Sequence, residues 1–402
     1  MANATRMRLA ALICTLLALA IPAGAGAGIL PTPKPPKPVL ATTGSDSELL
    51  TTLPVARQPG ARDRVAMRLD PTTLDPIEAG DRLRASAEVQ VSTTCVDPGP
   101  RCVGTNYGIN PTVTARIVLS PSPKADSGFL PLSPSHSVLC KQQRPNRNHH
   151  CTIAIPNTET TISDLSALPC PPSACYVDLI VGAVNKHAKR GNVVVLGADR
   201  PDGTVTQDKG RLNVVQAHAD VPAPTVISSD SLVNTELPLT INDSEKRRVV
   251  YSVPIPAPQK GEVLAFDARY LTGISALHFN TFISSRVITA AEPNDTKALK
   301  FAKNAIPLKG QATESNGFNC TLGASGYANA CTTVKAGAVR FTRDVVDNDT
   351  GEPATVYLNV LAGAKPLLAE KVDDSDKVSL GSLPGGLTVA RYGTASGGVQ
   401  AP

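Results

Sequence analysis

The stretch Arg82–Ser92, RLRASAEVQVS, alternates apolar and polar side chains residue by residue. Successive side chains of a β-strand point to opposite faces, so a period of two indicates a strand with one face turned to a core. The apolar positions of this stretch are Leu83, Ala85, Ala87, Val89 and Val91. The sequence therefore predicts a half-buried strand here.

Five further runs in the first half have a strand-forming composition and are separated by turn-rich sequence. They are Thr112–Leu119, Cys151–Ile155, Tyr176–Val184, Asn192–Leu196 and Arg211–Val215. The chain has no Trp and only 3% aromatic residues, so Val, Ile, Leu and Thr must build the core. Six or seven short strands of this kind are typical of a β-sandwich, and the pattern resembles that of immunoglobulin-like domains. The predicted fold class is all-β.

The second half of the chain repeats this pattern at offsets of 169 to 184 residues. The matched segments, in chain order, are 80–83 with 261–264, 112–120 with 281–290, 151–155 with 331–335, 176–183 with 356–364, 192–197 with 377–381, and 210–215 with 385–390. A period of this length indicates tandem domains, not a solenoid. We therefore expect two duplicated β-sandwich domains, 62–221 and 222–402, with an extra edge strand at 225–229 or 237–241.

Residues 1–27 have the pattern of a bacterial secretory signal peptide. Arg6 and Arg8 precede an apolar run, 9–21, that is too short to span a bilayer comfortably, and small residues follow it. We expect cleavage after Ala25 or Ala27, a secreted or cell-envelope location, and no membrane insertion of the mature chain. Residues 28–61 begin with closely spaced Pro residues and predict a Pro-rich disordered linker.

Eight cysteines follow the predicted signal peptide, and an even number in a secreted chain predicts disulfides. They form four close pairs in the sequence, namely Cys95 with Cys102, Cys140 with Cys151, Cys170 with Cys175, and Cys320 with Cys331. The second and fourth pairs each enclose ten residues and occupy matching places in the two repeats, which favours bonding within each pair. Three pairings remain open among the other four cysteines, and local pairing is the simplest of them.

The turn 347–352 is a candidate calcium site. It offers Asp347, Asp349 and Glu352, whose carboxylate oxygens are ligands that calcium prefers. An EF-hand loop would need a Glu where Leu358 stands, so only a looser sandwich-loop site fits. The alternative is an ordinary turn rich in Asx residues. No other cofactor is expected.

A histidine cluster, His136 with His149 and His150, surrounds the loop between Cys140 and Cys151. Adjacent histidines on a strand point to opposite faces and cannot easily share one metal ion. The matching loop of the second repeat contains no His. An exposed hairpin tip is therefore the favoured interpretation.

The charge, the aromatic content and the lack of catalytic motifs argue against several classes of function. The mature chain has a net charge of only +3, which is +5 without the two charges of Arg6 and Arg8, and few aromatic residues, so nucleic-acid binding is not expected. The sequence has no nucleophile elbow, zincin helix, P-loop or dinucleotide fingerprint. We expect a secreted, non-enzymatic binding or adhesion module for an unknown protein or a cell-envelope polymer. The alternatives are a structural subunit of an extracellular assembly and a secreted hydrolase with its site at the domain interface.

Overall fold

The structure is a computed structural model, and it describes most of the chain from residue 37 onward. The described ranges are 37–43, 52–93, 110–121, 128–140, 149–188, 192–196, 210–241, 246–274, 281–298, 316–320, 330–347, 350–366, 372–373 and 376–393. The predicted signal peptide lies outside these ranges. Residues 36–402 form one unit.

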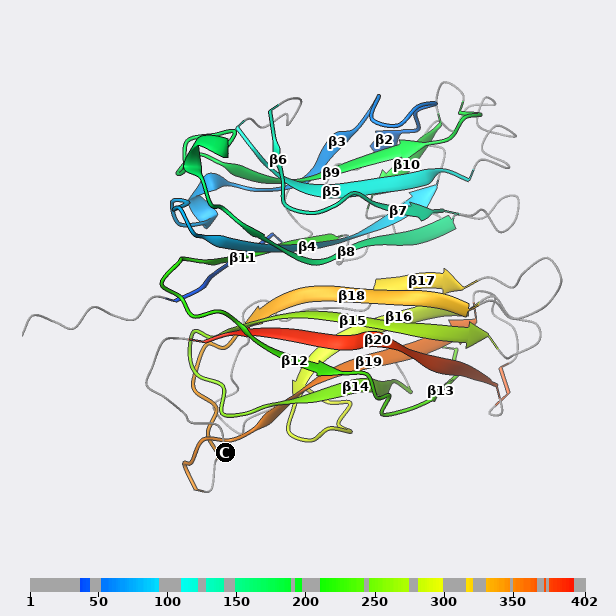
Figure 1. Cartoon of the computed structure of the whole chain (residues 1–402). Coiled ribbons are helices and arrows are strands. Elements are labelled where there is room, and N and C mark those ends of the chain that lie inside the picture. Colours follow the sequence, from blue (N-terminus) through cyan, green and yellow to red (C-terminus); the bar gives the residue numbers. More distant parts are fainter. Residues whose placement is uncertain are drawn as a thin grey trace, which may run out of the picture. The chain divides into compact units, whose positions relative to one another are not determined.

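Two antiparallel sheets form the first sandwich (Figure 1). One contains β1 (Val39–Thr43), β2 (Thr52–Pro54), β4 (Arg82–Thr93), β8 (His149–Thr161), β10 (Val193–Leu196) and β11 (Gly210–Ala217). Its order is β1-β11-β4-β10-β2, and β8 also pairs with β4. The other contains β3 (Arg64–Leu69), β5 (Thr112–Ser120), β6 (Leu130–Pro131), β7 (His136–Leu139) and β9 (Tyr176–Val184), in the order β3-β9-β5-β6 with β7 on β5. Two short 3-10 helices, η1 (Pro71–Thr73) and η2 (Leu165–Ala167), lie in the connections.

Two further antiparallel sheets form the second sandwich. One contains β12 (Thr225–Ser229), β13 (Glu236–Pro238), β15 (Val263–Ile274), β18 (Ala330–Arg340) and β20 (Lys377–Tyr392), in the order β12-β20-β15-β18 with β13 on β20. The other contains β14 (Arg248–Ile255), β16 (Thr281–Ala290), β17 (Asn316–Cys320) and β19 (Val356–Pro366), in the order β14-β19-β16-β17. Figure 1 shows β15 between β18 and β20.

The two sandwiches have matching strand order. β4 and β15 are the central strands of equivalent sheets, and the long β20 takes the places of both β10 and β11. Each central strand follows a glycine with positive φ, Gly80 at 91° and Gly261 at 93°, a conformation that side chains with a Cβ rarely adopt. Their N–H groups donate to the carbonyls of Ile162 and Phe341 respectively. The topology thus agrees with the repeat seen in the sequence, while a common origin of the halves stays a prediction.

The cores lie between the two sheets of each sandwich and follow the predicted alternation. The apolar face of β4 is almost completely buried, and its alternate residues join one core cluster with residues of β5 and β9. The core of the second sandwich is built around Tyr251, Phe266 and Tyr270. Burial of an aliphatic or aromatic side chain stabilises a fold by about 1.5–3 kcal/mol. These cores confirm the predicted all-β sandwich fold class.

The predicted disordered linker is wrong over its described part. Residues 39–43 form β1, which pairs with β11 in register from Val39 opposite Gln216 to Thr43 opposite Leu212. Residues 52–54 form β2, which pairs with β10. Edge strands tolerate nearby Pro residues, so a high Pro content does not exclude a strand. The stretch VLATT contains apolar residues that become partly buried when it pairs at the sheet edge.

Of the two extra-strand candidates between the halves, the first is a strand over its whole length and the second only over its first two residues. TVISS at 225–229 is β12 and pairs with β20, and Leu237 with Pro238 belongs to β13. The predicted domain boundary at 222 falls between β11 and β12. Independent folding of the two halves stays a prediction. In the part of the chain that the structure describes, no helix has the length and apolar character needed to cross a bilayer.

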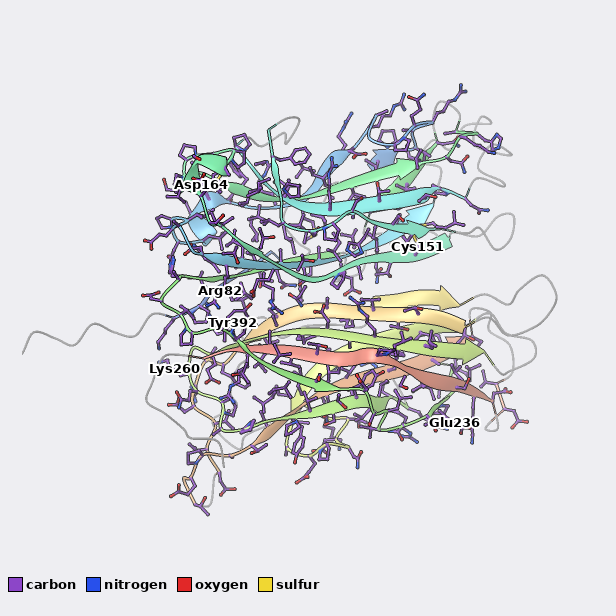
Figure 2. All side chains as sticks on the ribbon, in the orientation of Figure 1. Arg82, Cys151, Asp164, Glu236, Lys260 and Tyr392 are labelled. Atoms are coloured by element: carbon purple, nitrogen blue, oxygen red, sulfur yellow. A yellow bond between two sulfur atoms is a disulfide. The ribbon has the colours of Figure 1, made fainter. Side chains whose placement is uncertain are left out.

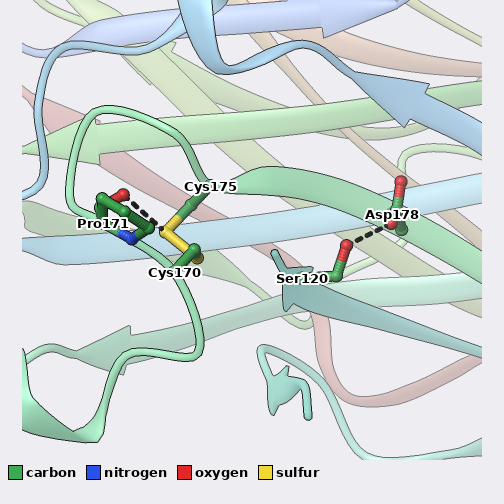
Figure 3. Close-up of a disulfide and its surroundings, with 5 residues drawn as sticks. All are labelled: Ser120, Cys170, Pro171, Cys175 and Asp178. Carbon is green, nitrogen blue, oxygen red and sulfur yellow. Dashed lines mark hydrogen bonds between the residues drawn. A yellow bond between two sulfur atoms is a disulfide. The ribbon is translucent and has the colours of Figure 1, made fainter. Parts of the chain in front are cut away.

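Two of the predicted disulfides are present. Cys140 bonds to Cys151 and Cys170 bonds to Cys175, with Cα–Cα distances of 5.4 and 5.3 Å. Figure 3 shows the second of them just before β9, close to the hydrogen bond from Ser120 to Asp178. Cys95 and Cys102 lie outside the described residues, and so do the side chains of Cys320 and Cys331. Their pairings stay predictions.

Replacing both Cys170 and Cys175 with Ser is expected to lower the free energy of unfolding by about 2 kcal/mol. A disulfide stabilises the fold by lowering the entropy of the unfolded chain, and this effect is modest for a loop as short as this one. Chemical denaturation of the oxidised double variant measures the loss. A loss above about 4 kcal/mol would mean that the bond has a role beyond closing this loop.

Candidate functional site

In each sandwich, the end at which the central strand (β4 or β15) finishes is called the loop end. In the first sandwich, β4 ends at Thr93 opposite the first residue of β8, and β5 begins at Thr112 opposite the last residue of β7. The Cys140–Cys151 disulfide joins these two pairs of strand ends. The segments attached there are 94–111, 140–148 and 185–192 in the first sandwich, and 275–280, 321–329 and 367–376 in the second. Figure 2 shows Cys151 toward this end and Arg82 toward the opposite, base end.

A buried ion pair joins the two sandwiches. Lys335 Nζ on β18 lies 2.9 Å from Glu88 Oε2 on β4, and the two side chains are only 4% and 5% exposed. Burying each charge costs several kcal/mol, and the attraction between the two charges offsets this cost. Loss of either partner therefore leaves the other as an uncompensated buried charge. We expect this contact to favour the one alignment of the sheets in which both charges meet.

A second polar contact joins Asn157 on β8 with β15 and β18. The N–H of Asn157 donates to Asp267 Oδ1 at 2.8 Å, and its side-chain amide donates to the carbonyls of Phe266 and Gly337. Burial raises the pKa of Asp267 to about 6, against the opposing effects of the Asn157 hydrogen bonds and of the Arg269 and Arg84 charges. The carboxyl is thus poised to change charge near neutral pH.

Tyr392 makes the third contact, near the base end. Its hydroxyl donates to Glu159 on β8, and the guanidinium of Arg84 lies 5.7 Å from the centre of its ring. Around it small apolar residues of both sandwiches form a common cluster: Val215, Ala217, Val221, Val263, Ala265, Ala338, Ala390 and Tyr392. Small side chains let the two sheets approach closely, so the surface between the sandwiches is packed.

The three polar contacts occur in the same order along both sandwiches. From the base end to the loop end, the first sandwich presents Glu159, Asn157 and Glu88, and the second presents Tyr392, Asp267 and Lys335. The strands β4 and β15 therefore run in the same sense, and the two loop ends face the same way. The three carboxylates here, Glu88, Glu159 and Asp267, already accept hydrogen bonds from protein groups. The alternative of a hydrolase at this interface stays a prediction.

The first sandwich carries a cluster of titratable groups at its base end, which we call the His218 cluster: Asp75, Glu78, Asp81 and His218. One ligand atom from each of Glu78, Asp81 and His218 lies within 4.8 Å of the other two. His218 Nδ1 lies 2.9 Å from Asp81 Oδ1, and Nε2 lies 3.5 Å from Asp75 Oδ2. No other group of this kind occurs among the residues that the structure describes.

Asp81 is the buried centre of this cluster, with a side chain that is 0% exposed. Its Oδ2 accepts hydrogen bonds from the N–H of Glu78 and from Gln216 Nε2. Gln216 also bonds to the backbone of Asp75 in both directions, which fixes the turn that carries the cluster. For His218 burial lowers the pKa most, but the hydrogen bonds and charges of Asp81, Asp75 and Glu78 together raise that pKa above its ordinary value.

The equivalent acid of the second sandwich has a different partner. Glu262 follows Gly261 as Asp81 follows Gly80, and its carboxylate accepts two hydrogen bonds from Arg391, each 3.0 Å long. Arg391 lies opposite Leu264 in the sheet register, the place that Gln216 takes opposite Leu83. Among the described residues, Asp81 therefore has no partner equivalent to the permanent cation that neutralises Glu262.

The predicted calcium turn is closed by its own hydrogen bonds. Asp347 Oδ1 accepts from the N–H and the hydroxyl of Thr350, three residues further along the chain. Asp349 lies outside the described residues and Glu352 is exposed. Calcium binding by Asp347, Asp349 and Glu352 stays a prediction.

The predicted histidine cluster is described only in part. His136 is on β7, and burial followed by the charge of Arg269 lowers its pKa. The side chains of His149 and His150 lie outside the described set, although both residues begin β8. The interpretation as a hairpin tip stays a prediction.

The His218 cluster was not predicted from the sequence, although a signal for it exists. Asp75, Glu78 and Asp81 recur every three residues in a turn-rich stretch, PTTLDPIEAGD, just before the strand that decides the fold. His218 stands 137 residues later, directly after β11. Only the pairing of β11 with β4 brings these segments together, so the spacing along the chain does not reveal the cluster.

Comparisons with known proteins identify no family. No family model matches the chain, and no curated protein matches it. Among solved structures, a peptide-N(4)-(N-acetyl-β-D-glucosaminyl)asparagine amidase is 10% identical, over 89% of this chain and 98% of that one, with a TM-score of 0.21. The CBM22-1–CBM22-2 tandem domain of Paenibacillus barcinonensis Xyn10C is 8% identical, over 88% and 91%, with a TM-score of 0.20. A protein of the T13 particle of IBDV is 10% identical, over 90% and 73%, with a TM-score of 0.20. Similarities this low carry no conclusion about the fold or function of this chain.

Proposed function

We propose that the chain is a secreted, non-enzymatic binding module that presents the connections of two joined sandwiches to a cell-envelope polymer. The observation that supports this function is the common direction of the two loop ends. Connections held by a rigid scaffold are where β-sandwich proteins commonly place their binding residues. The disulfides support an oxidising, extracellular location.

The interface between the sandwiches supports a single composite binding surface. The buried Glu88–Lys335 pair and the packed cluster around Tyr392 resist sliding of one sandwich on the other. Two sandwiches that are already held in one alignment lose less entropy on binding than two that move independently, which favours affinity. A long polymer that spans both loop ends would then contact two adjacent surfaces at once.

Co-sedimentation with purified peptidoglycan sacculi tests this function. We expect saturable binding of the oxidised chain, and a loss of about tenfold or more in affinity when a loop-end segment that contacts the polymer is replaced. Each loop-end segment is exchanged in turn for Gly-Ser sequence of equal length, starting with 275–280. The matched control is the same exchange of six residues, 122–127, within the connection from β5 to β6 at the base end.

Absence of saturable binding, or equal binding by all loop-end variants and the base-end control, would contradict the proposal. Binding to an immobilised extracellular protein instead of sacculi would keep the loop end as the site but change the class of partner. Folding of each variant is checked by its far-ultraviolet circular dichroism and thermal transition.

One observation favours the alternative of a structural subunit. β12 is the last strand on one side of its sheet, and Val226 on it is 60% exposed. An apolar strand at a sheet edge offers backbone groups for pairing with another chain. Light scattering separates the two functions, since a subunit of an assembly forms concentration-dependent oligomers and a solitary binding module stays monomeric.

A further inference from the structure

His218 has the environment of a metal-binding histidine. A carboxylate can only accept, so Nδ1–H donates to the buried carboxylate of Asp81, and in the neutral ring the lone pair is then on Nε2. Metal-ligating histidines are held in this way by a carboxylate on the other ring nitrogen. Asp81 itself is held by Glu78 N–H and Gln216 Nε2, so it orients the imidazole firmly.

The groups in front of Nε2 have the separation of metal ligands. Asp75 Oδ2 lies 3.5 Å from Nε2, which is longer than a normal hydrogen bond of about 2.7–3.2 Å. Two tetrahedral ligands that each lie about 2.0–2.1 Å from a zinc ion are about 3.4 Å apart. Asp75 is 57% exposed and His218 is 19% exposed, so an ion can reach them from solvent. The carboxylate of Glu78 lies within 4.8 Å of a ring nitrogen of His218 and of a carboxylate oxygen of Asp81, and it can complete the set.

The second sandwich gives an independent argument for a missing cation. There the guanidinium of Arg391 holds the acid Glu262 through two hydrogen bonds. In the first sandwich the neutral Gln216 takes the place of Arg391, yet three carboxylates surround the site instead of one. The excess negative charge favours binding of a cation, which no described Lys or Arg side chain supplies through a contact with Asp81.

We propose that the His218 cluster binds one divalent metal ion of the zinc class through His218 Nε2 and the carboxylates of Asp75 and Glu78. Asp81 is a positioning residue that orients the imidazole. Imidazole and carboxylate ligands in this number, with a position left for water, suit Zn²⁺ better than calcium, which takes six to eight oxygen ligands. The ion would tie the 75–81 turn to the segment after β11, where the chain passes from the first sandwich to the second. This inference does not depend on the proposed function.

Isothermal titration of the EDTA-stripped, oxidised chain with Zn²⁺ tests the site. We expect one ion per chain whose binding is lost in H218Q and is weakened about tenfold or more in D75N and E78Q. Asp75 and Glu78 are exposed, so their variants stay folded even where H218Q does not. The matched control is H187Q, since His187 is an exposed histidine outside the cluster.

X-ray absorption at the zinc edge supplies the second readout. We expect nitrogen and oxygen ligands that include a single imidazole. Sulfur ligands, zinc binding that survives in H218Q, or affinities that are equal in D75N, E78Q and the wild type would overturn the proposal. So would the absence of zinc binding by a chain that is folded and stripped of metal.

Discussion

Lys335→Met is expected to lower the free energy of unfolding by about 3–5 kcal/mol, the cost of leaving one partner of a buried ion pair without its counter-charge. Glu88 Oε2 lies 2.9 Å from Lys335 Nζ, and neither side chain is more than 5% exposed. Met fills much of the same volume, so the loss reports the stranded carboxylate and not a cavity. Chemical denaturation followed by circular dichroism measures it.

The chain contains a matched control for this variant. Lys377 Nζ lies 2.9 Å from Glu236 Oε2, the same distance, but these side chains are 53% and 56% exposed. Exposed ion pairs contribute about 0–1 kcal/mol because water screens the charges. Lys377→Met should therefore leave stability almost unchanged, and the difference between the two variants isolates the effect of burial.

A double variant tests the interpretation further. Glu88→Leu combined with Lys335→Met removes both charges, and replacement of buried pairs by apolar residues is often neutral or stabilising. Most of the loss seen in the single variant should return. If Lys335→Met costs no more than Lys377→Met, the sandwiches do not keep this contact in solution, and the composite binding surface loses its support.

The strands themselves were predictable because their signal is local. Arg82–Ser92 and Thr112–Leu119 coincide with β4 and β5 to within one residue at each end. Period-two alternation depends only on which side chains face the sandwich core, and the chain carries this pattern within a single strand. The second sandwich has the single strand β20 where the first has β10 and β11. The sequence pattern still predicts both halves of β20, since each half pairs with β15 as a separate strand would.

The interface between the sandwiches was not predictable for the same reason. Alternation assigns Ser86, Glu88 and Gln90 to the face of β4 away from its core, where polar residues normally meet water. In the structure they are 0%, 4% and 8% exposed, because the β15–β18 sheet covers this face. Burial of this polar face by another domain does not change the alternation of apolar and polar residues along the strand, so the sequence pattern does not reveal it.

The His218 cluster was likewise not predictable, because its residues meet only through long-range strand pairing. Asp81 is conspicuous in the sequence only as a turn residue after Gly80, and its partner Gln216 is an ordinary polar residue of a strand. Their hydrogen bond depends on the pairing of β11 with β4, across 135 residues of chain. A pairing of this range follows from the topology of the sheet, which local patterns do not specify.

Asp267→Asn is expected to change how stability depends on pH, with an effect of up to about 3 kcal/mol. Burial raises the pKa of Asp267 to about 6 from an ordinary value of 3.8, and each pKa unit corresponds to about 1.4 kcal/mol. The folded protein therefore holds a proton here, between about pH 4 and pH 6, that the unfolded chain releases. The wild type loses stability as pH rises through this window, in contrast to a carboxyl whose pKa is lowered by folding.

The substitution removes this dependence without removing the contact. An amide oxygen at position 267 still accepts from the N–H and side-chain amide of Asn157, and the group is neutral at every pH. The variant should be more stable than the wild type at pH 7 and should differ little from it at pH 4. Denaturation at both pH values measures the two differences.

An exposed carboxyl provides the control for that comparison. Asp70 precedes η1, where its side chain makes no capping hydrogen bond, so Asp70→Asn should shift stability equally at both pH values. A fall in stability of Asp267→Asn at pH 7 would mean that the attraction of Arg269 and Arg84 outweighs the cost of burial. The carboxylate would then act as a charged link between the sandwiches, and neutral pH would hold them together more firmly than acid. The expected result has the opposite consequence: the contact between the sandwiches is strongest below about pH 6, where the Asp267 carboxyl is protonated.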